Sequence, residues 1–193
     1  MASATIMRPL VSLTMPEEGL SRLATQVLLA VAGSLLMAAS SKISVPFWPV
    51  PMTMQTLALF VISAAYGRNL ATATMLLYLA EGAVGFPVFS KGGGLAYLAG
   101  PTAGYLLAYP IAAAIVGWAA DRGFDRNPFR LFGAMLVGEV VILGLGAAWL
   151  ASLLGVEKAL AAGIGPFMVV DLVKIALASA LVPALWSVVR RRA

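Results

Sequence analysis

The chain has 193 residues, of which 61% are hydrophobic and only 11% are charged, and its formal net charge is +5. Because soluble domains carry about 25% charged residues, this composition excludes a soluble globular domain and favours an integral membrane protein. The absence of cysteine and histidine excludes disulfide bonds, thiolate nucleophiles and the commonest metal ligands.

The first half of the chain predicts three transmembrane helices. Segment 1–19 lacks the continuous apolar core of a signal peptide, so we expect it to be cytoplasmic. A bilayer-spanning helix needs about 20 apolar residues, and the first such run is Leu23–Ser41. The proline-rich stretch Val45–Pro51 cannot continue a helix. A second helix is therefore expected over Met52–Tyr66 and a third over Leu70–Gly85.

The second half predicts three more transmembrane helices and three loops. In chain order these elements are a Gly-rich loop at Phe86–Gly94, a helix at Leu95–Ala120, a polar loop at Asp121–Arg130, a helix at Leu131–Leu154, an exposed loop at Gly155–Gly165 and a helix at Pro166–Val189. The fold class is thus an all-α membrane protein of six transmembrane helices. It forms a single transmembrane domain over 1–193, with the bundle at 20–189 and a basic tail at 190–193.

The distribution of basic residues sets the orientation. With the N-terminus in the cytoplasm, nine arginines lie on the cytoplasmic side and three lysines on the outer side, which satisfies the positive-inside rule. The nine are Arg8, Arg22, Arg68, Arg122, Arg126, Arg130, Arg190, Arg191 and Arg192, and the three are Lys42, Lys91 and Lys158. Both termini are therefore expected in the cytoplasm of a bacterial inner membrane. The basic residues serve as loop anchors, so no nucleic-acid partner is expected.

Charged residues within the last helix are the strongest functional clue. Asp171 and Lys174 are three residues apart and share one helix face. Each charge costs about 2.5–3.5 kcal/mol at the bilayer centre on insertion scales. We interpret the pair as part of a polar ligand site, with a purely structural ion pair as the alternative. Glu81 and Glu139 are weaker candidates, and their roles stay open.

Further candidates lie at the outer ends of the helices. Gln55 and Thr53 follow the proline-rich stretch and offer uncharged donors and acceptors. Phe89 and Tyr97 could wall a pocket for a partly apolar ligand, although such aromatics also occur in the membrane interface. The loop beginning at Lys91 is Gly-rich but is not a P-loop, because no Gly-Lys-Ser/Thr follows its glycines. A flexible gate over a pocket suits it better.

Small residues recur every fourth position of the first helix, at Ala30, Ser34 and Ala38. Such ridges let another helix approach closely. Packing within the bundle and docking onto a second membrane subunit are both consistent with this spacing.

Four sequence motifs resemble those of one family. They are Pro49–Leu57 (PVPMTMQTL), Tyr78–Phe89 (YLAEGAVGFPVF), Gly100–Leu106 (GPTAGYL) and Asp171–Lys174 (DLVK). Together and in this order they resemble the BioY family, the biotin-specific substrate-binding subunits of energy-coupling-factor transporters. Ala103 replaces the second glycine usual in the third motif.

The resemblance implies a six-helix bundle with an outward-facing biotin pocket, gated by the loops after the first and third helices. It implies that Asp171 and Lys174 contact the substrate, and that the ridge on the first helix docks a transmembrane coupling subunit. Two ATPase subunits would complete the importer, in a lipid bilayer and without a cofactor. A carboxylate can accept from a biotin ureido N–H, Lys174 can donate to the ureido carbonyl or hold Asp171, and Lys91 can meet the tail carboxylate. The expected site also includes Ser90 and Gly93.

Three other functions are consistent with parts of the sequence. A subunit of the same class could bind another vitamin, such as thiamine or riboflavin. An intramembrane enzyme could pair Glu139 with Asp171, although no shared motif supports it. A stand-alone channel or carrier would need no ATPase. Because the sequence holds no ATP-binding motif, we expect a binding subunit and not an enzyme.

Overall fold

The computed structural model describes residues 10–13, 16 and 19–192, and its regular elements are helices and one short β-hairpin. The helices are α1 (Leu20–Lys42), α2 (Gln55–Tyr66), α3 (Arg68–Ala83), α4 (Ala103–Ala120), α5 (Pro128–Leu154), α6 (Val156–Gly163) and α7 (Gly165–Arg192), and the strands are β1 (Ser44–Val45) and β2 (Met52–Thr53). Short 3-10 helices lie at Leu10–Leu13, Tyr97–Ala99 and Phe124–Arg126. The expectations for Arg8 and for most of segment 1–19 fall outside the described residues.

Four helical stretches of the described chain are long and apolar enough to cross a membrane. They are Leu20–Lys42, Ala103–Ala120, Pro128–Leu154 and Val156–Ser187, the last of which joins α6 to most of α7. This confirms a multi-pass helical membrane protein. α2 has 12 residues and α3 has 16, which is short for a full span, so six crossings stay a prediction.

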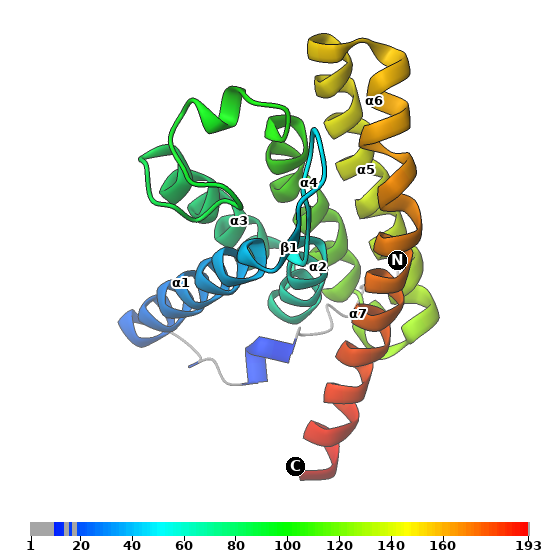
Figure 1. Cartoon of the computed structure of the whole chain (residues 1–193). Coiled ribbons are helices and arrows are strands. Elements are labelled where there is room, and N and C mark those ends of the chain that lie inside the picture. Colours follow the sequence, from blue (N-terminus) through cyan, green and yellow to red (C-terminus); the bar gives the residue numbers. More distant parts are fainter. Residues whose placement is uncertain (1–9, 14–15, 17–18, 193) are drawn as a thin grey trace, which may run out of the picture.

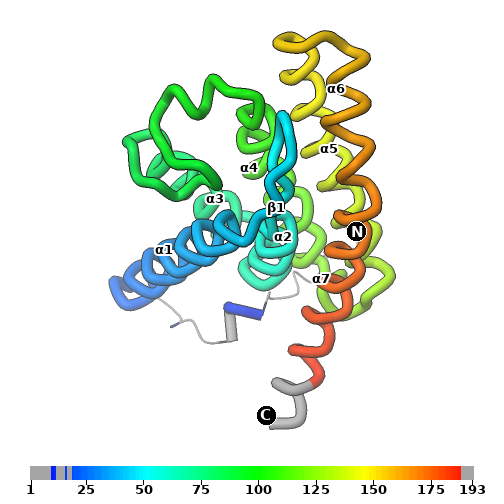
Figure 2. Tube along the Cα trace, viewed as in Figure 1, coloured from blue at the N-terminus to red at the C-terminus, as the bar shows by residue number. Residues whose placement is uncertain are grey.

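The helices form a bundle around α2 and α4, with α1 leaning away from it. α4 packs most extensively against α5 and also against α3 and α2, while α2 contacts α7. Figure 1 shows α5 and α7 running side by side, joined by α6 at one end, with the β-hairpin rising beside them. The tube in Figure 2 shows the segment between α3 and α4 arching over the same end of the molecule as the hairpin.

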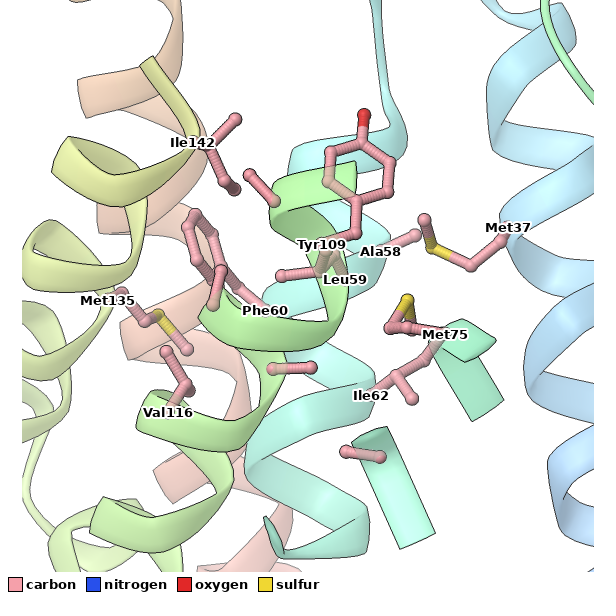
Figure 3. Close-up of a cluster of buried hydrophobic side chains, with 14 of the residues drawn as sticks. Met37, Ala58, Leu59, Phe60, Ile62, Met75, Tyr109, Val116, Met135 and Ile142 are labelled. Carbon is pink, nitrogen blue, oxygen red and sulfur yellow. The ribbon is translucent and has the colours of Figure 1, made fainter. Parts of the chain in front are cut away.

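The core lies below this loop-covered end. α2 and α4 contribute Phe60 and Val116, and α1, α3 and α5 contribute Met37, Met75 and Met135 (Figure 3). All five side chains are fully buried. Close packing of this kind supports the end of the bundle where the polar residues gather.

Several helix boundaries differ from those expected. The expected fourth helix from Leu95 begins at Ala103, because Gly94 has a φ of +97° and Gly100–Pro101 interrupts the chain. The second helix begins at Gln55, because Met52 and Thr53 pair with β1 instead. The exposed loop expected at Gly155–Gly165 contains α6. α6 has eight residues and each strand has two, and segments this short cannot be predicted from periodicity.

The proline-rich stretch forms the tip of the hairpin. β1 and β2 are antiparallel, with Ser44 opposite Thr53 and Val45 opposite Met52. The Trp48–Pro49 peptide bond is cis. The hairpin thereby places Thr53 directly before α2, next to the polar residues of α7.

A buried polar contact joins the loop between α4 and α5 to the far end of α7. The indole N–H of Trp186 donates to Oδ2 of Asp125 at 2.5 Å, and both residues are buried. Asp125 Oδ1 has no hydrogen-bond partner among the described residues. The polar loop expected at Asp121–Arg130 is therefore partly an internal packing element.

We expect Asp125→Ala to lower the free energy of unfolding by about 1–3 kcal/mol, because it removes the buried hydrogen bond that Asp125 accepts from the Trp186 N–H. Asp125→Asn keeps an acceptor oxygen and should cost less. Burial raises the pKa of Asp125, so its stabilising contribution is present below the unfolded pKa and is lost as pH rises through the folded pKa. Thermal unfolding in detergent between pH 4 and 8 tests this, because Asp125→Asn should lack that part of the pH dependence. An equal loss in both variants would contradict the hydrogen-bond argument.

Candidate ligand-binding site

A cavity opens between the ends of α2, α4, α5 and α7, below the loop that precedes α4. It comprises about 530 Å³ of empty space, its open mouth included. Its lining is Val50, Pro51, Thr53, Gln55, Thr56, Phe89, Ser90, Tyr97, Thr102, Tyr105, Leu106, Tyr109, Glu139, Ile142, Leu143, Phe167, Asp171 and Lys174. Seven of the nine residues expected to bind substrate are therefore brought together.

The cavity floor carries a buried ion pair. Lys174 Nζ lies 2.7 Å from Asp171 Oδ1, and the two residues are 5% and 2% exposed. They occupy the inward face of α7, which continues through the buried residues Ile175, Ala178 and Val182. The helix period explains this placement, because positions 171, 174, 175, 178 and 182 share one face.

Lys174 has an acceptor for each of its three ammonium N–H groups. Besides Asp171, it donates to the carbonyl oxygen of Thr53 at 2.7 Å and to Thr56 Oγ1 at 3.2 Å. The Thr56 hydroxyl in turn donates to Asp171 Oδ1 at 3.0 Å. In this conformation Lys174 has no further N–H group to donate to a ligand. Of its two expected roles, this favours holding Asp171 in place over donating to the ureido carbonyl.

Gln55 belongs to a second polar chain, which leads to the overlying loop. Its amide nitrogen donates to the Tyr78 hydroxyl at 2.7 Å, and Tyr78 donates to the carbonyl oxygen of Val88 at 3.0 Å. The Thr53 hydroxyl donates to Gln55 Oε1 at 3.0 Å and accepts from the Gln55 backbone N–H at 3.3 Å. Gln55 and Thr53 thus connect the cavity wall to the loop between α3 and α4.

That loop is fastened over the cavity through Phe89. The Phe89 ring is fully buried. It stacks on the Tyr97 ring with the ring centroids 5.0 Å apart, and it forms a T-shaped pair with the Tyr78 ring at a centroid distance of 5.4 Å. From the end of α1, Ser41 donates to the Val88 carbonyl at 2.8 Å and Lys42 to the Phe89 carbonyl at 2.6 Å. These contacts close the outer side of the site.

Lys91 and Gly93 are not among the residues that line the cavity, so their expected contacts with the ligand stay predictions. Lys91 is exposed on the loop. A Cβ at Gly93 would lie 2.0 Å from the Phe86 carbonyl oxygen, so glycine is required there for loop packing.

We expect Lys91→Ala to leave ligand affinity within about twofold of the parent, because this ammonium group is outside the cavity. Lys158→Ala, an exposed change on α6, is the matched control. Titration calorimetry on both variants measures the effect. A tenfold or greater loss for Lys91→Ala alone would mean that Lys91 reaches the ligand.

Several lining residues were not expected. Thr56 lies one turn from Thr53 and beside Gln55, so its position in the same motif was an available signal. Tyr105 and Tyr109 are four residues apart on α4, and Tyr105 lies within the third motif. Glu139 was noted as an intramembrane acid but not assigned, and its 4% exposure places it in the cavity wall.

The ridge of small residues on α1 packs against the bundle. Ser34 is fully buried and its hydroxyl donates to Glu81 on α3, and Ala38 packs on the core. Of the three ridge residues only Ala30 and Ala38 keep accessible surface. Of the two alternatives that the spacing left open, the structure therefore places Ser34 in packing within the bundle. Docking of a second subunit by Ala30 and Ala38 stays a prediction.

Comparisons with known proteins converge on one family. Residues 9–191 match the family model described as BioY family. The chain is 38% identical over 156 residues to a probable biotin transporter BioY of Pyrococcus horikoshii, covering 80% of this chain and 92% of that protein. It is 31% identical over 157 residues to a biotin transporter BioY of Thermotoga maritima, covering 80% and 91%.

One solved structure matches the fold. A crystal structure of the S-component for biotin from an ECF-type ABC transporter superposes with a TM-score of 0.77 at 21% identity, covering 88% of this chain and 95% of that one. At this identity the match concerns the fold. It agrees with the arrangement of helices around the cavity described above.

Proposed function

This chain belongs to the BioY family, and we propose that it is the biotin-binding subunit of an energy-coupling-factor importer. It binds biotin from outside the cell and passes it across the membrane with the help of partner subunits. It is a transporter subunit and not an enzyme.

The observation that carries the proposal is the cavity with one buried ion pair and otherwise uncharged or aromatic walls, apart from Glu139. Biotin combines an apolar fused ring with a ureido group, and pockets for such ligands are mostly apolar with a few placed polar groups. Both hydrogen bonds that Asp171 accepts within the protein end on Oδ1. Oδ2 is the atom we assign to a ureido N–H, while Phe89 and Tyr97 cover the rings. Thr53, Gln55 and Ser90 complete the polar wall.

The proposed topology has six membrane crossings with both termini in the cytoplasm of a bacterial inner membrane. Supporting it, Arg68, Arg122 and Arg126 lie at one end of the bundle and Lys42 and Lys158 at the other. α2 and α3 are short, and the hairpin and the loop before α4 extend the protein at their outer ends. We assign these two segments as the gates of the site.

If transport is driven by ATP, the energy must come from partner subunits, because the sequence has no ATP-binding motif. The proposed partners are a transmembrane coupling subunit and two ATPase subunits. Lipid-facing apolar side chains, such as Leu28 and Leu35 of α1, cover much of the outer surface and are available to lipid or to the coupling subunit.

The test is titration calorimetry of the detergent-purified chain with biotin, with thiamine and riboflavin as controls. We expect selective biotin binding at a 1:1 ratio. Binding of thiamine or riboflavin instead would keep the architecture and overturn the substrate. Uptake of biotin by liposomes that lack any ATPase would favour a stand-alone carrier.

A further inference from the structure

Glu139 is a buried acid to which no group of the described residues donates a hydrogen bond. It lies on α5 with 4% of its surface exposed, and neither carboxyl oxygen has a hydrogen-bond partner among the described residues. It lines the cavity together with Ile142 and Leu143, one turn further along α5. Gly138 beside it lets α4 and α2 pack closely, with Val116 and Phe60 about 3 Å from a Cβ built there.

The charges around Glu139 do not balance it. On α7, the carboxyl group of Asp171 lies within hydrogen-bonding reach of Glu139, and Lys174 is near enough for its charge to act on it. Lys174 is already paired with Asp171, and its three donors are all used within the protein. The site therefore holds two carboxyl groups for one ammonium group. A buried polar group without a partner destabilises the empty protein, and such groups are typical of functional sites.

The chemistry of the ligand, taken from the proposed function on which this inference rests, identifies what Glu139 can bind. A carboxyl oxygen accepts hydrogen bonds, so it needs an N–H or O–H donor. The carboxylate tail of biotin has no donor and carries the same sign of charge, and the thioether and the ureido carbonyl have no donor either. The two ureido N–H groups are the remaining candidates, and Asp171 can accept from one of them.

We propose that Glu139 binds the second ureido N–H of biotin, so that carboxyl groups on α5 and α7 each accept from one nitrogen of the ring. This arrangement makes the site specific for cyclic ureas and gives the unpartnered carboxyl group a partner only when ligand is bound. Glu139 lowers the stability of the empty protein, and the hydrogen bond that it gains from the ligand strengthens binding.

The experiment compares Glu139→Ala and Glu139→Gln with the parent, using biotin and the two biotins that carry one methyl group on one ureido nitrogen. Glu81→Gln is the matched control, because Glu81 is a half-buried acid of α3 that bonds Ser34 outside the cavity. Calorimetry measures affinity, and thermal unfolding without ligand measures the stability of each empty variant.

We expect Glu139→Ala to bind biotin about 10- to 100-fold more weakly, because it leaves a buried ureido N–H without an acceptor. Glu139→Gln should be intermediate, Glu81→Gln unchanged, and the empty Glu139 variants as heat-stable as the parent or more so. For the parent, we expect one of the two methylated biotins to bind more weakly than biotin. For Glu139→Ala, the same methylated biotin should bind nearly as well as biotin does, because the shortened side chain leaves room for the methyl group.

Parent-like affinity of Glu139→Ala would overturn the inference, as would equal losses for both methylated biotins in that variant. A large drop in the melting temperature of the empty variants would assign Glu139 to the fold and also overturn it. These outcomes differ from failure of the proposed function, in which the parent itself does not bind biotin.

Discussion

Lys174→Ala is expected to lower biotin affinity by at least about 100-fold and the free energy of unfolding by about 3–5 kcal/mol. The substitution removes three hydrogen bonds and leaves Asp171, which is 2% exposed, as an unpaired charge in the bundle. It also frees the side chain that is proposed to accept from biotin. Calorimetry and thermal unfolding in detergent measure the two effects.

A double variant separates the two consequences of losing the ion pair. In Asp171→Asn with Lys174→Met both charges are gone, so most of the lost stability should return while biotin binding does not. Lys158→Ala on the surface of α6 serves as the control and should change neither quantity. If Lys174→Ala kept parent-like affinity, the pair would be structural and the ligand would lie elsewhere.

Gly82→Ala is expected to displace the loop that covers the site. A Cβ at this position of α3 would lie 2.0 Å from Cζ of Phe89. The ring cannot yield easily, because it is fully buried between Tyr78 and Tyr97. We expect a loss of about 1–3 kcal/mol from overpacking and a fall in biotin affinity of about tenfold or more, since Phe89 lines the cavity.

Gly144→Ala is the matched control for this change. It is also a glycine within a helix, but nothing lies within 4 Å of a Cβ built there, so stability and affinity should stay at or above those of the parent. Combining Gly82→Ala with Phe89→Ala should cost less than the sum of the two single changes, because the clash is gone. Strictly additive losses would show that Gly82 and Phe89 do not act through contact.

Several parts of the fold and site could be predicted from the chain itself. Asp171 and Lys174 stood out because charges are costly in an apolar helix, and their i, i+3 spacing places them on one face in any α-helix. The helices at Leu20–Lys42 and Pro128–Leu154 were predictable because long apolar runs leave few alternatives in a membrane. The four motifs, in this order, predicted that the chain belongs to the BioY family, and the family match confirms this.

Other features depended on contacts between segments far apart in the chain. Sequence spacing did not reveal that Thr56 bridges Asp171 and Lys174, or that Phe89 lines the cavity and Lys91 does not. Ser34 could equally have faced a partner or this bundle, because a ridge of small residues packs against either.

Composition, apolar run length and intramembrane charge by themselves determined a helical membrane protein with a polar site on its last helix. The reason is that the free energy of placing a segment in the bilayer depends mainly on the residues of that segment. The tertiary structure decided which polar groups meet in the cavity. It also decided that all three N–H groups of Lys174 donate to acceptors within the protein, and that no described group donates to Glu139. Those properties depend on the packing of α2, α4, α5 and α7, which no single segment specifies.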